Sequence, residues 1–318
     1  MSPGDAGVDL SARVGSVHLR NPVMTASGTS GHGAELGAYI DLAGLGAVVV
    51  KSVSAEAWPG NPAPRVHPLP GGIGMINSVG LQGPGVEAWL RDDLPALEAS
   101  GATVVASIWG TSVDAYAKAA AMLREAPACV VAVEVNVSCP NVEDRRRMFA
   151  HSASATAEVI EATAACGRPR WAKLSPNVTD ITEVAGAALG AGAEALTLIN
   201  TVMGMVIDPV DGSFALGAGG GGLSGPAVHA VAVRVVYECR SAFPAAGIVG
   251  VGGVAGGADV AELMAAGADA VQVGTATFAE PQAPARVLAE FDRWCRDNGL
   301  RRSSDLIGRA GRSASASQ

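Results

Sequence analysis

Residues 247–275 read GIVGVGGVAGGADVAELMAAGADAVQVGT and carry one strand–helix–strand unit. Two continuous apolar runs, Gly247–Val251 and Ala270–Val273, flank an amphipathic stretch at 257–266. Apolar residues that are continuous rather than alternating predict strands buried on both faces, as in a parallel sheet. This unit therefore predicts an α/β fold built from parallel strands.

The same pattern recurs along the rest of the chain. The other apolar runs are Val23–Ala26, Ala47–Val50, Thr103–Ala106, Val130–Val137, Trp171–Leu174 and Ala195–Ile199. The other amphipathic stretches lie near 33–44, 84–100, 112–126, 152–166, 180–191, 226–242 and 282–297. This alternation predicts a (β/α)8 TIM barrel, with an open doubly wound sheet as the alternative. We expect one domain over 1–308, long loops at Trp58–Leu81 and Met203–Gly222 over its C-terminal face, and a disordered tail over 309–318.

Composition excludes several classes of protein. The chain has 318 residues, of which 49% are hydrophobic, so a sizeable core can form. A formal net charge of −8 argues against nucleic-acid binding, which needs clustered cations. No apolar stretch is long enough to predict a transmembrane helix, and the N-terminus has no signal-peptide pattern. The 5 cysteines form no CxxC motif and no metal-site spacing, which indicates a reducing, cytoplasmic setting.

Two lysines occupy apolar strands. Lys51 ends one run and Lys173 lies inside another. A buried ammonium is costly unless an anion pairs with it, so both side chains are expected to face a cavity that holds negative charge. The alternative is a lysine that reaches solvent from a strand end, or one that pairs with a core carboxylate such as Glu134.

Glycines follow the last two strands. Gly252-Gly253 and Gly274-Thr275 can bring main-chain N–H groups close to an anion, and Gly225 could add another donor. Loops after the seventh and eighth strands are a recurrent phosphate site in this fold. These residues predict a phosphate site, although each glycine alone is equally compatible with an ordinary turn.

Polar side chains follow other strands. The amides of Asn77, Asn136, Asn141 and Asn200 offer a donor and an acceptor each, which suits a heterocycle with C=O and N–H edges. Cys139 lies in a polar loop, where a reactive thiol is plausible. The remaining thiols, Cys129, Cys166, Cys239 and Cys295, are expected to act as small apolar core residues.

Several motifs resemble dihydroorotate dehydrogenases, in that family's order, from about residue 8 to 298. They are Asn136–Asn141 (NVSCPN), Lys173–Asn177 (KLSPN), Leu198–Thr201 (LINT), Gly222–Pro226 (GLSGP) and Val271–Thr275 (VQVGT). The cysteine at position 139 resembles the cytosolic class 1 enzymes, which have cysteine at this position, whereas class 2 enzymes have serine there. Lys51-Ser52, Pro59–Pro62 and Asn77–Gln82 resemble the class 1B branch.

The resemblance implies a TIM barrel that holds FMN and oxidises (S)-dihydroorotate to orotate in pyrimidine synthesis. Cys139 would be the base that removes the C5 proton while a hydride passes from C6 to the flavin, and Lys173 would stabilise the anionic reduced flavin. The implied substrate residues are Lys51, Asn77, Ser78, Val79, Gly80, Leu81, Asn136, Asn141, Asn200 and Thr201. The implied FMN residues are Ser27, Lys51, Ser52, Asn136, Lys173, Ile199, Gly225, Gly252, Gly253, Gly274 and Thr275.

The class 1B resemblance also implies a homodimer of catalytic chains and a separate FAD and iron–sulfur subunit that passes electrons to NAD. A class 1A enzyme would instead be a homodimer that uses fumarate. The chain departs from the family at Ser107 and Trp109, where an Asn near the flavin and a small residue are usual, at 142–147, and at Gly217–Gly222, which is expected to be more mobile. Three rival interpretations are a flavin-free phosphate-binding lyase or isomerase, an FMN enzyme for another pyrimidine, and a binding protein that has lost turnover.

Overall fold

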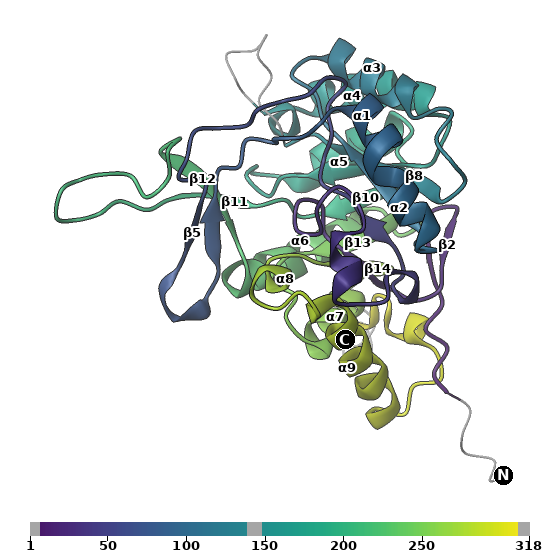
Figure 1. Cartoon of the computed structure of the whole chain (residues 1–318). Coiled ribbons are helices and arrows are strands. Elements are labelled where there is room, and N and C mark those ends of the chain that lie inside the picture. Colours follow the sequence, from purple (N-terminus) through teal and green to yellow (C-terminus); the bar gives the residue numbers. More distant parts are fainter. Residues whose placement is uncertain (1–6, 139–147, 311–318) are drawn as a thin grey trace.

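The computed structural model describes residues 7–138 and 148–310. Its main sheet has 8 strands, all parallel, in the order β3, β14, β13, β10, β9, β8, β7, β4. Their bounds are β3 Val23–Thr25, β4 Val48–Val49, β7 Val104–Ile108, β8 Val130–Asn136, β9 Arg170–Leu174, β10 Ala195–Leu198, β13 Gly247–Val251 and β14 Ala270–Val273. The strands surround a common axis with helices outside them (Figure 1). Every predicted strand is present within a few residues.

The sheet closes into a barrel between β3 and β4, the strands at the two ends of this order. Met24 and Ala47 form a parallel bridge, and the Thr25 N–H donates to the Ala47 carbonyl over 3.2 Å. The Gly46 N–H donates to the carbonyl of Val23 over 2.8 Å. The predicted (β/α)8 barrel is therefore confirmed, and the open doubly wound sheet is wrong.

Gly46 lies just before β4, close to the main chain that leads into β3. A Cβ at this position would be 2.3 Å from the main-chain oxygen of Asn21. We expect Gly46→Ala to destabilise the protein by about 2–3 kcal/mol, because the main chain must move to admit the methyl group. Gly190→Ala is the matched control, since a Cβ there meets nothing within 4 Å. Urea denaturation of both variants tests this, and equal midpoints would contradict it.

Helices cover the barrel as expected, with one exception. The helices are α1 Val86–Ala88, α2 Leu94–Ala99, α3 Val113–Met122, α4 Ala153–Ala162, α5 Ile181–Gly190, α6 His229–Ala242, α7 Gly257–Ala266, α8 Ala276–Ala279 and α9 Ala283–Asp297, and a π-helical turn at Trp89–Asp93 joins the first two. The helix expected near 33–44 is wrong. Two short 3-10 helices, Glu35–Ala38 and Leu42–Gly44, stand there, because the Asp41 side chain accepts from the Ala43 N–H and starts a new turn.

The two long segments expected as loops build a second sheet instead. Strands β5 Val66–Pro68 and β6 Met75–Asn77 come from the first segment, and β11 Val202–Met205 and β12 Gly220–Ser224 from the second. They pair antiparallel in the order β11, β12, β6, β5 and form an arm beside the barrel (Figure 1). Gly220–Gly222 thus pair with β11, and Gly222 also pairs with β6, where a loop was expected. Local patterning missed this sheet because its central pairing, between β12 and β6, is long-range.

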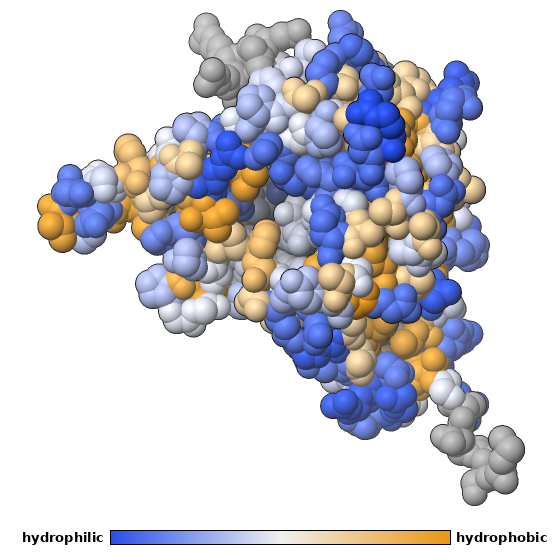
Figure 2. Space-filling model, in the orientation of Figure 1, coloured by the Kyte–Doolittle hydropathy of each residue, from blue (hydrophilic) through white to orange (hydrophobic). Residues whose placement is uncertain are grey.

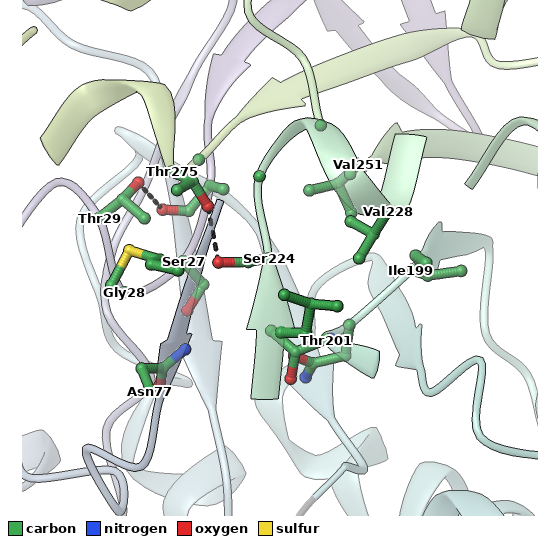
Figure 3. Close-up of a pocket in the computed structure, with 18 of the residues that line it drawn as sticks. Ser27, Gly28, Thr29, Asn77, Ile199, Thr201, Ser224, Val228, Val251 and Thr275 are labelled. Carbon is green, nitrogen blue, oxygen red and sulfur yellow. Dashed lines mark hydrogen bonds between the residues drawn. The ribbon is translucent and has the colours of Figure 1, made fainter. Parts of the chain in front are cut away.

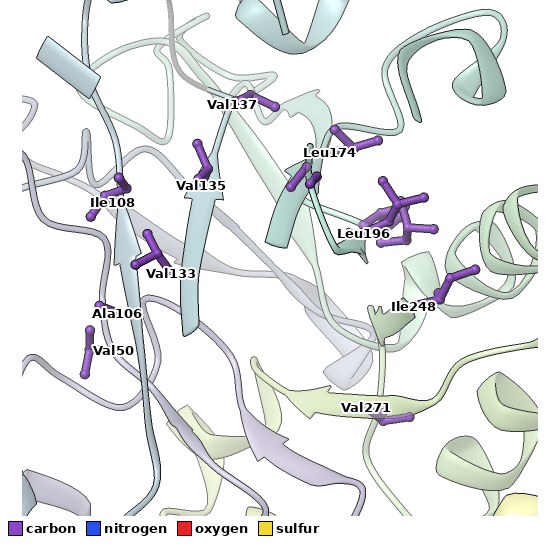
Figure 4. Close-up of a cluster of buried hydrophobic side chains, with 14 of the residues drawn as sticks. Val50, Ala106, Ile108, Val133, Val135, Val137, Leu174, Leu196, Ile248 and Val271 are labelled. Atoms are coloured by element: carbon purple, nitrogen blue, oxygen red, sulfur yellow. The ribbon is translucent and has the colours of Figure 1, made fainter. Parts of the chain in front are cut away.

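The core is divided by the barrel wall. Apolar strand residues that face outward, such as Val133, Val135 and Leu196, pack against the helices (Figure 4). A smaller cluster fills the N-terminal end of the barrel, where Trp171 and Met24 meet the hairpin formed by β1 Ala12–Val14 and β2 Val17–Leu19. The barrel interior is therefore filled at this end by the described residues, and the C-terminal end, where ligands bind in this fold, is left for a site.

Two further expectations concern the chain ends and membranes. Most of the predicted tail, residues 311–318, lies outside the described residues. Within 7–138 and 148–310, no helix is both long and apolar enough to cross a bilayer.

Candidate functional site

A pocket opens at the C-terminal end of the barrel, between the strand ends and the arm. It spans about 920 Å³ including the open solvent at its mouth. Side chains from both parts converge on it (Figure 3), and the molecular surface is hollowed between the arm and the barrel (Figure 2). The lining comprises Ala26, Ser27, Gly28, Thr29, Val66, Met75, Asn77, Val79, Lys173, Ile199, Asn200, Thr201, Leu223, Ser224, Gly225, Val228, Val251, Gly252, Gly253, Gly274, Thr275 and Phe278.

Most of the predicted site residues line this pocket. They are Ser27, Asn77, Val79, Lys173, Ile199, Asn200, Thr201, Gly225, Gly252, Gly253, Gly274 and Thr275. Others do not line it, namely Lys51, Ser52, Ser78, Gly80, Leu81 and Asn136. Cys139 and Asn141 lie outside the described residues, as does the segment 142–147. The structure thus brings the glycines that follow β13 and β14 into one pocket with Lys173, whereas Lys51 does not line this pocket.

Main chain lines one end of the pocket, where β13 ends. Gly252 and Gly253 have φ values of +139° and +71°, which L side chains rarely adopt. A Cβ on Gly253 would lie 2.6 Å from the Cβ of His229, whose ring Nδ1 is 2.8 Å from the Gly252 oxygen. Because only glycine fits, main-chain N–H groups can approach a ligand closely, as in anion-binding turns.

Lys173 has a partner within the barrel. Its side chain reaches the pocket but the residue is only 5% exposed, and its Nζ lies 3.6 Å from Oε1 of Glu134, which is fully buried. The alternative foreseen for this lysine, pairing with a core carboxylate, is therefore observed together with its contact to the cavity. Burial of Lys173 alone does not demand an anionic ligand, since Glu134 compensates the charge.

A chain of serine hydroxyls connects the pocket wall to this carboxylate. Ser27 and Ser52 lie 3.1 Å apart, and Ser52 lies 2.8 Å from Ser107. Ser107 in turn donates to Oε1 of Glu134 over 3.3 Å. Ser107, one of the departures from the family pattern, thus has a defined structural role beneath the pocket and does not line it.

Trp109, the second departure, is buried beside another tryptophan. Its ring packs edge-on against Trp58, with centroids 5.4 Å apart. Trp109 is 3% exposed and does not line the pocket. The large side chain is therefore accommodated beside the pocket without filling it.

The asparagines form a second network. Asn136 is buried, and its amide donates to Ser52 over 3.3 Å and accepts from Nδ2 of Asn200 over 3.1 Å. Asn177 donates to the carbonyl of Thr201 over 3.0 Å and accepts from the N–H of Met203 over 2.9 Å. Asn136 and Asn177 therefore orient Asn200 and Thr201, the residues that line the pocket.

Lys51 lies outside the pocket lining, close to a second cation. Its ammonium donates to the carbonyl of Gln82, and the guanidinium of Arg65 donates to the side chain of the same glutamine. Burial and the nearby charge of Arg65 lower the pKa of Lys51. No carboxylate in the described part of the chain forms an ion pair with Lys51. This arrangement favours an anion beside it.

Sequence reasoning missed several pocket residues. Ser224 lies in the quoted GLSGP motif and accepts from the Thr275 hydroxyl over 2.8 Å (Figure 3), so its motif was the available signal. Thr29, Val228 and Phe278 also line the pocket. Nothing in their local sequence marks them, because they reach the pocket only through the packing of loops and helix ends.

The four other thiols behave as predicted. Cys166, Cys239 and Cys295 are buried and Cys129 is half-buried, and none forms a disulfide. Burial raises the pKa of Cys239 to about 12 and that of Cys295 to about 11. These thiols therefore stay protonated and serve the core.

Comparison with known proteins agrees with this geometry. The family model for dihydroorotate dehydrogenase matches residues 9–294. The chain is 46% identical, over 96% of its length and 98% of the relative, to "Dihydroorotate dehydrogenase B (NAD(+)), catalytic subunit" of Desulforudis audaxviator. Proteins of the same description from Pelobacter propionicus and Geobacter sp. strain M21 are each 42% identical over 94% of this chain, and 98% and 97% of their own lengths are covered. A barrel with this pocket, matched over nearly its whole length, belongs to the dihydroorotate dehydrogenase family.

Proposed function

We propose that this chain is the catalytic subunit of an NAD-dependent dihydroorotate dehydrogenase, which oxidises dihydroorotate to orotate with FMN in pyrimidine biosynthesis. One observation carries the proposal: a single pocket joins a glycine-lined end at Gly252 and Gly253 to the buried ammonium of Lys173. That combination suits a ligand with a phosphate at one end and a polar ring at the other.

The residues present fit FMN. The main chain around Gly252, Gly253 and Gly274 would hold the phosphate, with the Thr275 and Ser224 hydroxyls beside it. Val228, Val251 and Ile199 line the pocket (Figure 3), and this apolar wall would suit a flat ring. Lys173 would meet the polar edge of that ring. The bound flavin would supply the hydride acceptor, which no side chain can provide.

Substrate would lie on the side of the pocket toward the arm. Asn77, Asn200 and Thr201 line that region and can bond the C=O and N–H edges of a pyrimidine. Cys139, which directly follows Ser138 at the end of β8, would remove the C5 proton. Lys51, with no carboxylate partner in the part described, would attract the substrate carboxylate.

The relatives named as catalytic subunits favour a partner. We infer a homodimer of this chain in the cytoplasm, joined to a separate FAD and iron–sulfur subunit that carries electrons to NAD. The alternative acceptor is fumarate, used by a homodimer alone. The net charge of −8 and the pocket chemistry favour a small-molecule substrate over nucleic acid.

Lys51→Met is expected to raise the KM for dihydroorotate about tenfold or more, since a charge-assisted hydrogen bond contributes about 1.5–3 kcal/mol. The wild-type KM should be low while the ammonium is protonated and rise as pH passes its pKa. Because that pKa is lowered by burial and by Arg65, the rise begins at a lower pH than for a free lysine. Initial rates across pH test this, with Lys118→Met, an exposed lysine, as control. A pH-dependent KM in Lys51→Met would contradict it.

One anaerobic experiment tests the function itself. The purified protein should be yellow, and titration with dihydroorotate should bleach the flavin absorbance with formation of orotate. NAD and fumarate are then offered separately, with and without a co-purified partner subunit. A colourless protein would favour a phosphate-binding lyase or isomerase. A yellow protein that other pyrimidines bleach and dihydroorotate does not would indicate a different substrate, and one that no pyrimidine bleaches would indicate a binding protein.

A further inference from the structure

One buried carboxylate lies beneath the pocket and is contacted from three other strands. Oε2 of Glu134, on β8, accepts from Nε2 of Gln272 on β14 over 2.8 Å. Its Oε1 accepts from Ser107 on β7 over 3.3 Å and lies 3.6 Å from Nζ of Lys173 on β9. Every one of these neighbours presents a donor, so the site is built for an ionised carboxylate.

Glu134 does not line the pocket, whereas Lys173 does. The glutamate is fully buried and has no route to a ligand except through its neighbours. It therefore acts on a ligand through the ammonium above it, by holding that ammonium in place and by opposing its charge.

The negative charge of Glu134 opposes the positive charge of Lys173. In a buried setting two charges interact far more strongly than in water, so the carboxylate lowers the positive potential that Lys173 presents to the pocket. Resting on the proposed function, we propose that Glu134 is a positioning residue that sets how strongly Lys173 favours negative charge on the flavin. Removal of its charge, with shape retained, makes the flavin easier to reduce.

Glu134→Gln is the isosteric test, with Ser107→Ala as the matched variant that loses a hydrogen bond to the same oxygen but no charge. Sulfite affinity and midpoint potential of the flavin-loaded protein are measured, since sulfite binds more tightly to flavins of higher potential. We expect the sulfite Kd of Glu134→Gln to fall about tenfold and the potential to rise, because one buried charge is removed. Ser107→Ala should stay within about twofold of wild type.

Unchanged values in Glu134→Gln, or equal shifts in both variants, would overturn the proposal and leave Glu134 a merely structural residue. If Glu134→Gln does not fold, Lys173→Met is compared with the double variant Lys173→Met/Glu134→Gln. The double variant should be more stable in urea, because Lys173→Met alone leaves the carboxylate unpaired. A wild-type protein that takes up no flavin would contradict the proposed function, and the urea comparison would still test the coupling of the two residues.

Discussion

Cys139→Ala is expected to lower kcat for dihydroorotate by about 10²–10⁴-fold while FMN stays bound, because general base catalysis contributes on that scale. The thiol directly follows Ser138, whose N–H donates to Asn136 over 3.2 Å, and Asn136 in turn holds the pocket residue Asn200. Ser138, the residue before Cys139 in the sequence, is thus bonded to the network that orients the substrate side of the pocket.

The measurement is steady-state turnover, together with flavin content from the visible spectrum. Cys139→Ser should retain part of the activity, because a hydroxyl can take the same position, and activity of the wild type should rise toward alkaline pH as a free thiol ionises near pH 8.5. Cys129→Ala is the control, a half-buried thiol that is not part of the described pocket lining. Normal turnover in Cys139→Ala would remove this residue from the mechanism.

Lys173→Met is expected either to lose flavin or to slow flavin reduction by dihydroorotate by about 10²-fold or more. Two causes act together. The substitution removes a charge placed where negative charge develops in the ligand. It also leaves the fully buried Glu134 without its cation, and an uncompensated buried charge costs about 3–5 kcal/mol.

Stopped-flow measurement of flavin bleaching at saturating dihydroorotate separates these causes from weaker binding of dihydroorotate. Flavin content and the urea midpoint are recorded on the same samples. Lys118→Met serves as control, because Lys118 is exposed and pairs with Glu56 on the surface, where such pairs contribute little. A normal bleaching rate in a fully loaded Lys173→Met protein would refute the role given to this lysine.

The barrel could be predicted from the sequence because its strands are buried on both faces. Runs such as 247–251 and 270–273 are apolar throughout, and the structure places strands there with the same bounds. The single helix expected at 33–44 does not form, for a local reason. The Asp41 side chain accepts a hydrogen bond from the Ala43 N–H, which ends one turn and begins another. An apolar periodicity does not report such competition from a side chain.

The arm could not be predicted, because its central pairing joins segments that are far apart in the chain. Met75–Asn77 pairs with Gly222–Ser224, far away in the chain, and the strands are short. Register across such distances is decided by the folded barrel that brings the segments together.

By itself the sequence determined the parallel barrel, the end at which a ligand enters, and the glycines at one end of the pocket, because apolar runs and the residues that follow them are local properties of the chain. Only the tertiary structure decided which charges meet. Lys173 and Glu134 stand on neighbouring strands and share one buried site, whereas Lys51 stands beside Arg65 with no carboxylate partner in the described residues. Coulomb energy depends on distance and burial, and a linear chain specifies neither until it has folded.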